Sequence, residues 1–68
     1  MDRSRIIAMA NQIATFFEPY SEEEAIDGVE GHIRSFWEPR MRAELRDILN
    51  SDPDRLSPAA RSAAQRLD

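Results

Sequence analysis

The chain turns a sharp corner within Phe36-Trp37-Glu38-Pro39-Arg40-Met41-Arg42. Pro39 has no backbone N–H, and the residue before a proline avoids the helical region, so a helix is expected to end here. A proline also suits the first turn of a new helix, where its missing N–H leaves no hydrogen bond unmade. Apolar residues recur at helical spacing on both sides of the corner. The segment therefore predicts two helices that meet at Pro39, over residues 21–37 and 39–50.

The helix before the corner has a clear start and two unusual residues inside it. Ser21 stands where its hydroxyl can cap the helix, and Glu24 follows three residues later, which is the pattern of a capping box. Gly28 and Gly31 each cost about 1 kcal/mol in a helix interior relative to alanine. They favour close approach of another backbone, and the alternative is that they weaken this helix in the free protein.

Two further helices are predicted on either side, at residues 4–18 and 57–67. The first carries a broad apolar face, since Ile7 and Ala14 fall outside its main stripe, and it is expected to bury two faces. The second is rich in alanine and is expected to bury little area and to be the least stable helix. The sequence predicts an all-α fold, a compact bundle of three to four short helices in a single domain of residues 1–68. Six aliphatic side chains are expected to form the inner core: Ile6, Ile13, Val29, Ile33, Leu45 and Ile48.

Composition narrows the classes of function. The 68 residues carry a net charge of −4 and contain no cysteine. An acidic chain lacks the attraction that holds proteins on nucleic acids and anionic membranes, and without cysteine there is neither a disulfide nor a thiolate metal site. A core of this size is marginal by itself, so a partner protein or self-association is expected to add stability. No apolar run has the length of a signal h-region or a membrane span, and cytoplasmic residence is expected.

His32 is the only histidine, which makes it the obvious candidate for acid–base catalysis or metal ligation near neutral pH. Helical spacing fixes no nucleophile near it, and Glu30 lies on a different face of the helix. The acidic run at 22–24 matches the helix dipole better than it matches the ligand spacing of a calcium loop. An enzyme built on His32 would need a pocket that so short a chain scarcely encloses. The sequence therefore predicts no catalytic residue and no metal ligand.

Two adjacent aromatic pairs point to a binding surface. Neighbouring residues on a helix project about 100° apart, so Phe16 with Phe17, and Phe36 with Trp37, cannot all face one thin core. At least one ring of each pair is expected at the edge of the core or outside it. Trp37 beside Arg40 is the expected interface anchor, because tryptophan and arginine dominate binding hot spots.

Three stretches together resemble a known family. They are Met9-Ala10-Asn11-Gln12-Ile13 with Phe16-Phe17 after it, the glutamate-rich start of the helix at residue 21, and His32 followed by the corner at 36–42. In order and spacing they resemble the small delta subunit of bacterial NAD-dependent, molybdenum-containing formate dehydrogenases. The resemblance implies a non-catalytic accessory subunit that docks on the large catalytic subunit. The implied cofactors, a bis-molybdopterin guanine dinucleotide, iron–sulfur clusters and a flavin, belong to that complex, with none in this chain.

The implied role is to stabilise that complex or to assist its maturation. Five residues are predicted to contact the large subunit: Asn11, His32, Arg34, Trp37 and Arg40. The alternative is a free-standing small helical regulator that binds protein or DNA as a dimer. Acidic residues between the arginines of the corner favour ordinary surface pairing over nucleic-acid binding. The broad apolar faces could also pair two copies into a homodimer when the chain is isolated.

Overall fold

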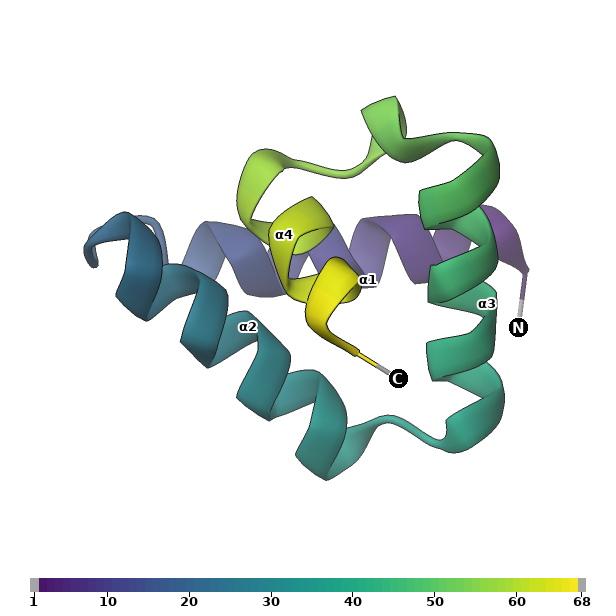
Figure 1. Cartoon of the computed structure of the whole chain (residues 1–68), viewed down its shortest axis with the longest axis horizontal. Coiled ribbons are helices and arrows are strands. Elements are labelled where there is room, and N and C mark those ends of the chain that lie inside the picture. The colour runs from purple at the N-terminus through teal and green to yellow at the C-terminus, as the bar shows by residue number, and fades with distance from the viewer. Residues whose placement is uncertain (1, 68) are drawn as a thin grey trace.

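The computed structural model describes residues 2–67 and contains four α-helices in that range (Figure 1). They are α1 (Arg3–Phe16), α2 (Glu22–Phe36), α3 (Pro39–Ser51) and α4 (Pro58–Arg66). A short 3-10 turn, η1 (Pro53–Arg55), lies between α3 and α4 and is absent from the sequence-based prediction. The described residues contain no strand, and the predicted all-α class is confirmed.

The starts of α2, α3 and α4 follow from their first residues. Ser21 Oγ accepts a hydrogen bond from the N–H of Glu24 at 3.2 Å, and the Ser21 N–H donates to the Glu24 carboxylate at 3.3 Å. The predicted capping box is thus present at the start of α2. Pro39 and Pro58 stand in the first turns of α3 and α4, where a proline leaves no helical hydrogen bond unmade.

The helix ends differ slightly from the predicted ones. The bounds of α2 and α4 are one residue shorter at each end. Helix α1 stops at Phe16 rather than at residue 18, because the Glu18 N–H donates to the Thr15 carbonyl at 3.1 Å and tightens the last turn. Helix α3 runs on to Ser51, whose hydroxyl donates to the carbonyl of Asp47 at 2.8 Å.

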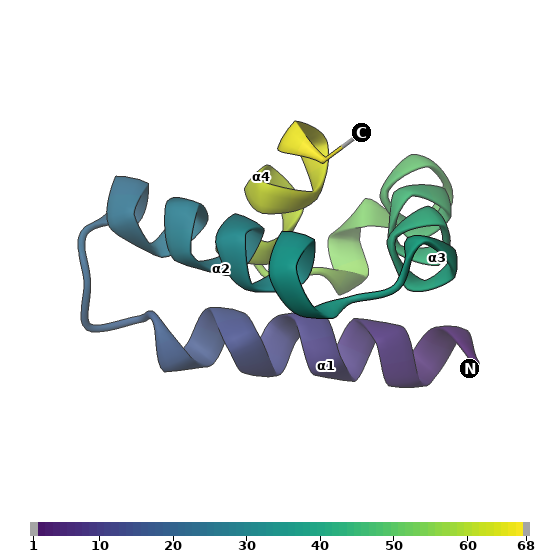
Figure 2. The same ribbon diagram turned by 90° about the horizontal axis from the view of Figure 1, so that it is seen from below.

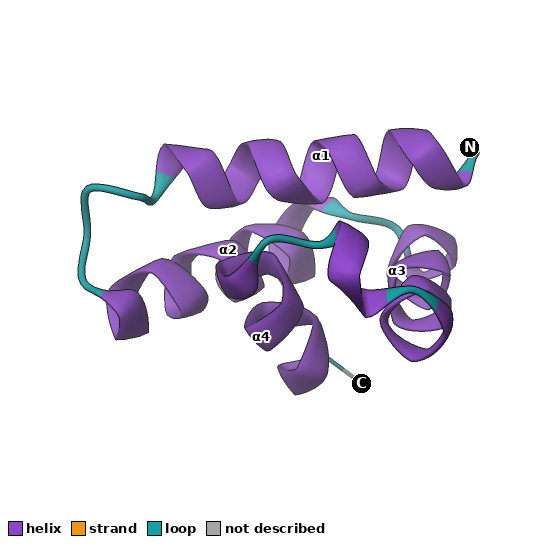
Figure 3. Ribbon diagram, turned by 90° about the horizontal axis from the view of Figure 1, so that it is seen from above, coloured by secondary structure: helices purple, strands orange, loops and turns teal. Residues whose placement is uncertain are grey.

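Helices α1 and α2 form a hairpin, α3 crosses one end of it, and α4 packs against the other three. Helices α1 and α2 run antiparallel, and α3 crosses the end of the hairpin that holds the N-terminus of α1 (Figures 1 and 2). The chain then returns through η1, and α4 packs into the space between the other helices (Figure 3). The whole measures 29 × 24 × 18 Å.

One hydrophobic core forms where these helices meet. Ile13 is only partly buried, because its side chain lies at the edge of the core and lines a surface groove. Ile7 and Ala14 are buried, so α1 does bury the broad face that was predicted. Leu56 and Leu67, which precede and follow α4, complete the core. The remaining predicted core residues are all buried: Ile6, Val29, Ile33, Leu45 and Ile48.

The alanine-rich helix α4 lies at the centre of the fold, which corrects the expectation that it buries little. Ala60, Ala63 and Ala64 are all buried, and α4 packs most extensively against α2. Small side chains let helix backbones approach closely, so a short helix fits among three longer ones. The Arg46 guanidinium also donates to the Leu67 carbonyl and ties the end of α4 to α3.

Only one of the two glycines in α2 is closely packed. A Cβ added to Gly28 would overlap the ring of Phe17, with Cζ at 2.6 Å. A Cβ added to Gly31 would have no heavy atom within 4 Å. Gly28 is therefore closely packed, but against the Phe17 side chain and not against another backbone as predicted, and the prediction is wrong for Gly31 in the isolated chain.

The different surroundings of Gly28 and Gly31 predict opposite effects on stability when each glycine is replaced by alanine. Gly31→Ala is expected to raise the free energy of unfolding of the isolated chain by about 0.5–1 kcal/mol, because alanine favours the helix and restricts the unfolded chain. Gly28→Ala is expected to lower it by about 1–2 kcal/mol, because the new methyl group displaces the Phe17 ring. Urea denaturation followed by far-ultraviolet circular dichroism measures both. Equal effects at the two positions would contradict this difference in packing.

Trp37 lies on the inside of the corner. Its N–H donates to the Ile33 carbonyl at 2.9 Å, and its own carbonyl accepts from the Arg42 guanidinium at 2.5 Å. The residue is only 5% exposed and belongs to the core. Its backbone is extended, with φ −91° and ψ 139°. The helical spacing from which Trp37 was predicted to be an outward interface anchor therefore does not apply to its side chain. Trp37 is therefore a core residue of the free chain.

Removal of this side chain is expected to unfold the isolated protein. Trp37→Ala should cost about 3–5 kcal/mol, which approaches the whole stability of a small domain. Phe36→Ala at the neighbouring, exposed position is the matched control, with an expected change within about 0.5 kcal/mol. Thermal melts of both variants by circular dichroism make the comparison. A cooperative melt of Trp37→Ala at the wild-type temperature would contradict the assignment of Trp37 to the core.

Candidate protein-binding surface

Asn11, the first of the predicted contact residues, is used within the fold. Its Nδ2 donates to the Arg55 carbonyl at 3.0 Å, and its Oδ1 accepts from the Ser57 N–H at 2.8 Å. One side-chain amide therefore satisfies two backbone groups of the segment that joins η1 to α4. This role holds the connection against α1.

Arg34 is also engaged inside the molecule. Its guanidinium contacts the Glu30 carboxylate at 2.9 Å and donates to the Arg66 carbonyl at 3.0 Å. Arg66 in turn pairs with Asp27 at 2.6 Å, and the hydrogen bond to Asp27 raises the pKa of Arg66. These contacts fasten the last turn of α4 to α2. Arg34 is exposed, yet its charge is already matched by the chain itself.

A shallow groove of about 270 Å³ lies between α1 and the C-terminal half of α2. The α1 side carries Met9, Gln12, Ile13 and Phe16, and the α2 side carries His32 and the edge of Trp37. The His32 ring packs on Phe36, with ring centroids 4.9 Å apart. We call this surface, made of the six lining residues and Phe36, the aromatic groove.

Two phenylalanine rings of the aromatic groove are strongly exposed. Phe16 is 71% exposed and Phe36 is 74% exposed, whereas Phe17 and Trp37 pack against the core. The prediction that one ring of each adjacent pair lies at the edge of the core or outside it is confirmed. The predicted contact set names neither Phe16 nor Phe36. Phe17 packs against Gly28 and leaves Phe16 facing outward, and the extended backbone at Trp37 takes that ring into the core and leaves Phe36 exposed.

Charged residues of both signs lie near the aromatic groove along the chain, and two of them are the arginines Arg5 and Arg40. Arg5 precedes Met9 by one helical turn and so lies on the same face of α1. Arg40 follows Trp37 in the first turn of α3 and is exposed. Neither forms an ion pair with another described residue. By contrast, Arg3 contacts Asp47 at 2.8 Å, and that hydrogen bond raises the pKa of Arg3.

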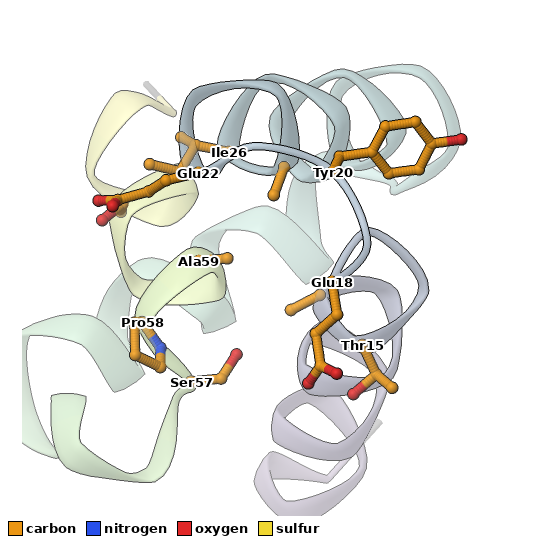
Figure 4. Close-up of a pocket in the computed structure, with 11 residues that line it drawn as sticks. Thr15, Glu18, Tyr20, Glu22, Ile26, Ser57, Pro58 and Ala59 are labelled. Atoms are coloured by element: carbon orange, nitrogen blue, oxygen red, sulfur yellow. The ribbon is translucent and has the colours of Figure 1, made fainter.

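A larger pocket of about 460 Å³ lies elsewhere, between the α1–α2 connection and the start of α4. Figure 4 shows the Glu18 carboxylate and the Thr15 and Ser57 hydroxyls near its mouth, while the Tyr20 ring points away. None of the predicted contact residues lines it. Its lining combines carboxylates and hydroxyls with small apolar side chains and has no histidine that could act as a base.

The described part of the chain has little in it that could hold a metal. Among residues 2–67, no three histidine, aspartate or glutamate side chains come together as a metal site requires. Within the same range, no helix is long and apolar enough to cross a membrane. The aromatic groove is thus the surface that gathers the most exposed apolar side chains, and its chemistry suits contact with another macromolecule.

Comparison with known proteins gives one match. A family model described as the NADH-dependent formate dehydrogenase delta subunit, FdsD, matches residues 5–64. Searches of curated proteins and of solved structures found nothing similar. The matched range includes the whole aromatic groove and the corner at Pro39, and it confirms the resemblance carried by residues 9–17 and 32–42. A delta subunit is one component of a larger enzyme, so other subunits are its partners. The chain belongs to the NADH-dependent formate dehydrogenase delta subunit family, FdsD.

Proposed function

We propose that the protein is a non-catalytic accessory subunit of a cytoplasmic, molybdenum-containing formate dehydrogenase and docks on its large catalytic subunit. The observation that carries this proposal is the exposure of Phe16 and Phe36 on one groove, in a chain of a subunit family. Burial of a phenylalanine side chain stabilises by about 1.5–3 kcal/mol relative to exposure. Burial of both rings against a partner subunit would therefore stabilise the complex.

The structure revises the set of residues that we propose for this contact. His32 and Arg40 stay in it, because both are exposed, His32 lines the aromatic groove, and Arg40 follows Trp37 closely in the chain. Phe16 and Phe36 join them as the apolar anchors. The other three predicted residues are engaged within the chain: Asn11 with the connection before α4, Arg34 with the end of α4, and Trp37 with the core.

The cofactors of the proposed complex are assigned to the partner subunits. Iron–sulfur clusters are held by cysteine thiolates, and this chain contains no cysteine. The proposed contribution of this chain is a fixed helical surface that covers part of the large subunit. Such a surface can stabilise the assembled enzyme or hold the large subunit during cofactor insertion.

Removal of the exposed rings should weaken the complex without unfolding the chain. Phe16→Ser with Phe36→Ser is expected to reduce affinity for the large subunit by roughly 30-fold or more, the effect of losing a hot spot, while the melting curve of the isolated chain is nearly unchanged. Tyr20→Ser is the matched control, since Tyr20 is 53% exposed and lies outside the aromatic groove.

Co-purification with a tagged large subunit, with molybdenum measured in the eluate, gives both the affinity and the role. Equimolar recovery in the active enzyme supports a resident stabilising subunit. Release before activity appears, with molybdenum lost when the chain is absent, supports maturation. Wild-type binding by the doubly substituted chain would contradict docking through the aromatic groove.

The non-catalytic role can be checked at the only histidine. In assembled enzyme that contains His32→Gln at full occupancy, kcat for formate-dependent NADH formation is expected to match the wild type, because His32 packs on Phe36 at the surface. The assay compares enzyme of equal subunit ratio, determined by quantitative mass spectrometry. A fall of kcat by roughly 100-fold or more, the effect of losing a general acid or base, would give His32 a catalytic role.

A further inference from the structure

We infer that the aromatic groove receives one amphipathic helix of the partner subunit, laid in a fixed direction with its acidic end against Arg5 and Arg40. This inference rests on the proposed function, since it names the chemistry of the partner at the same surface.

The form of the aromatic groove favours a helix as its occupant. Its α1 side extends from Met9 to Phe16, which is about 10 Å along the helix, or two turns. Amphipathic helices bind in this way, with apolar side chains one turn apart inserted between two helices of the receptor.

The two ends of the aromatic groove differ in chemistry. Because α1 and α2 run antiparallel, Met9 and Trp37 lie toward one end and Phe16 toward the other (Figure 2). At the Phe16 end the surface is aromatic, since the Phe16 and Phe17 rings are in contact with centroids 5.1 Å apart. Toward the opposite end, Arg5 lies one helical turn before Met9 on α1, and Arg40 follows Trp37 in the first turn of α3.

The lining of the aromatic groove differs in charge from the chain as a whole. The protein has 13 acidic residues and a net charge of −4, yet none of the residues that line the aromatic groove is acidic. The nearest carboxylates along the chain are those of Glu18 beyond the Phe16 end, Glu30, which pairs with Arg34 and Arg66, and Glu38, the N-cap residue of α3. At the start of α1, Asp2 accepts from the Arg5 N–H at 3.0 Å. The guanidinium groups of Arg5 and Arg40 make no ion pair with the described residues.

Unpaired guanidinium groups at one end complement carboxylates, or the negative C-terminal end of a helix dipole. The apolar middle and the basic end together select a helix whose apolar stripe is followed by acidic residues. The same arrangement excludes the reverse direction, because the acidic end would then meet rings instead of arginines.

Two measurements on the full chain with the large subunit test this inference. The first introduces the photo-crosslinking residue p-benzoylphenylalanine at Gln12, on the aromatic groove, or at Ser62, on the other pocket, and identifies the linked peptide by mass spectrometry. The expected result is a crosslink from position 12 to a helical peptide of the large subunit that carries aspartate or glutamate beside apolar residues.

The second measurement reverses charge at the basic end. Arg5→Glu with Arg40→Glu is expected to weaken binding by roughly 10-fold or more at low salt, with a smaller effect at high salt. Both positions lie in the first turn of a helix, where glutamate is favourable, so the substitutions do not harm the fold. Arg55→Glu is the matched control, since Arg55 is exposed, forms no ion pair with the described residues and lies in η1 away from the aromatic groove. Lysine at both positions should retain most of the affinity.

The outcomes separate this inference from the proposed function. A complex that forms but crosslinks from Ser62 and not from Gln12, or that binds the charge-reversed chain as well as the wild type, would overturn the inference and leave the accessory role intact. A crosslink from Gln12 to a second copy of this chain would overturn it in favour of a homodimer surface. Failure of any complex to form would overturn the accessory role and the inference with it.

Discussion

The close packing of the alanine face of α4 against its neighbours is the interaction on which the rest of the structure depends. A hairpin of α1 and α2 crossed by α3 leaves a space in the middle that only a helix with small side chains can enter. Ala60, Ala63 and Ala64 fill that space, and Leu56 and Leu67 close it on either side. Without α4, the apolar faces of α2 and α3 would meet water, so the short helix determines whether the longer ones have a core.

Much of this architecture can be predicted from local signals in the sequence. The Ser21 and Glu24 capping box, the prolines that start α3 and α4, and the apolar stripes each act through neighbouring residues, so they are visible without a structure. The importance of α4 could not be predicted in the same way. Each alanine side chain buries little area. Alanine stabilises this fold by letting two helix backbones approach closely, and that effect depends on both helices, so it is not visible in the sequence of α4 alone.

The candidate binding surface could be predicted only in part, for a similar reason. Neighbouring residues on a helix point about 100° apart, so one ring of each adjacent aromatic pair is expected at the edge of the core or outside it. This spacing does not tell which of the two rings it is. At Phe16 and Phe17 the choice is made by contact with Gly28, and at Phe36 and Trp37 it is made by the extended backbone after α2. Asn11 and Arg34 are polar groups of the kind used at interfaces, and only their partners in the fold reveal that they serve the chain itself.

The amide of Asn11 has a consequence for the chemical durability of the protein. It donates to one peptide group and accepts from another, so it takes the place of a backbone unit beside the connection before α4. Hydrolysis to a carboxylate would keep the acceptor and lose the donor, and it would set a negative charge against the carbonyl of Arg55. Deamidation at this single position would therefore loosen the connection before α4 and, with it, the packing of that helix.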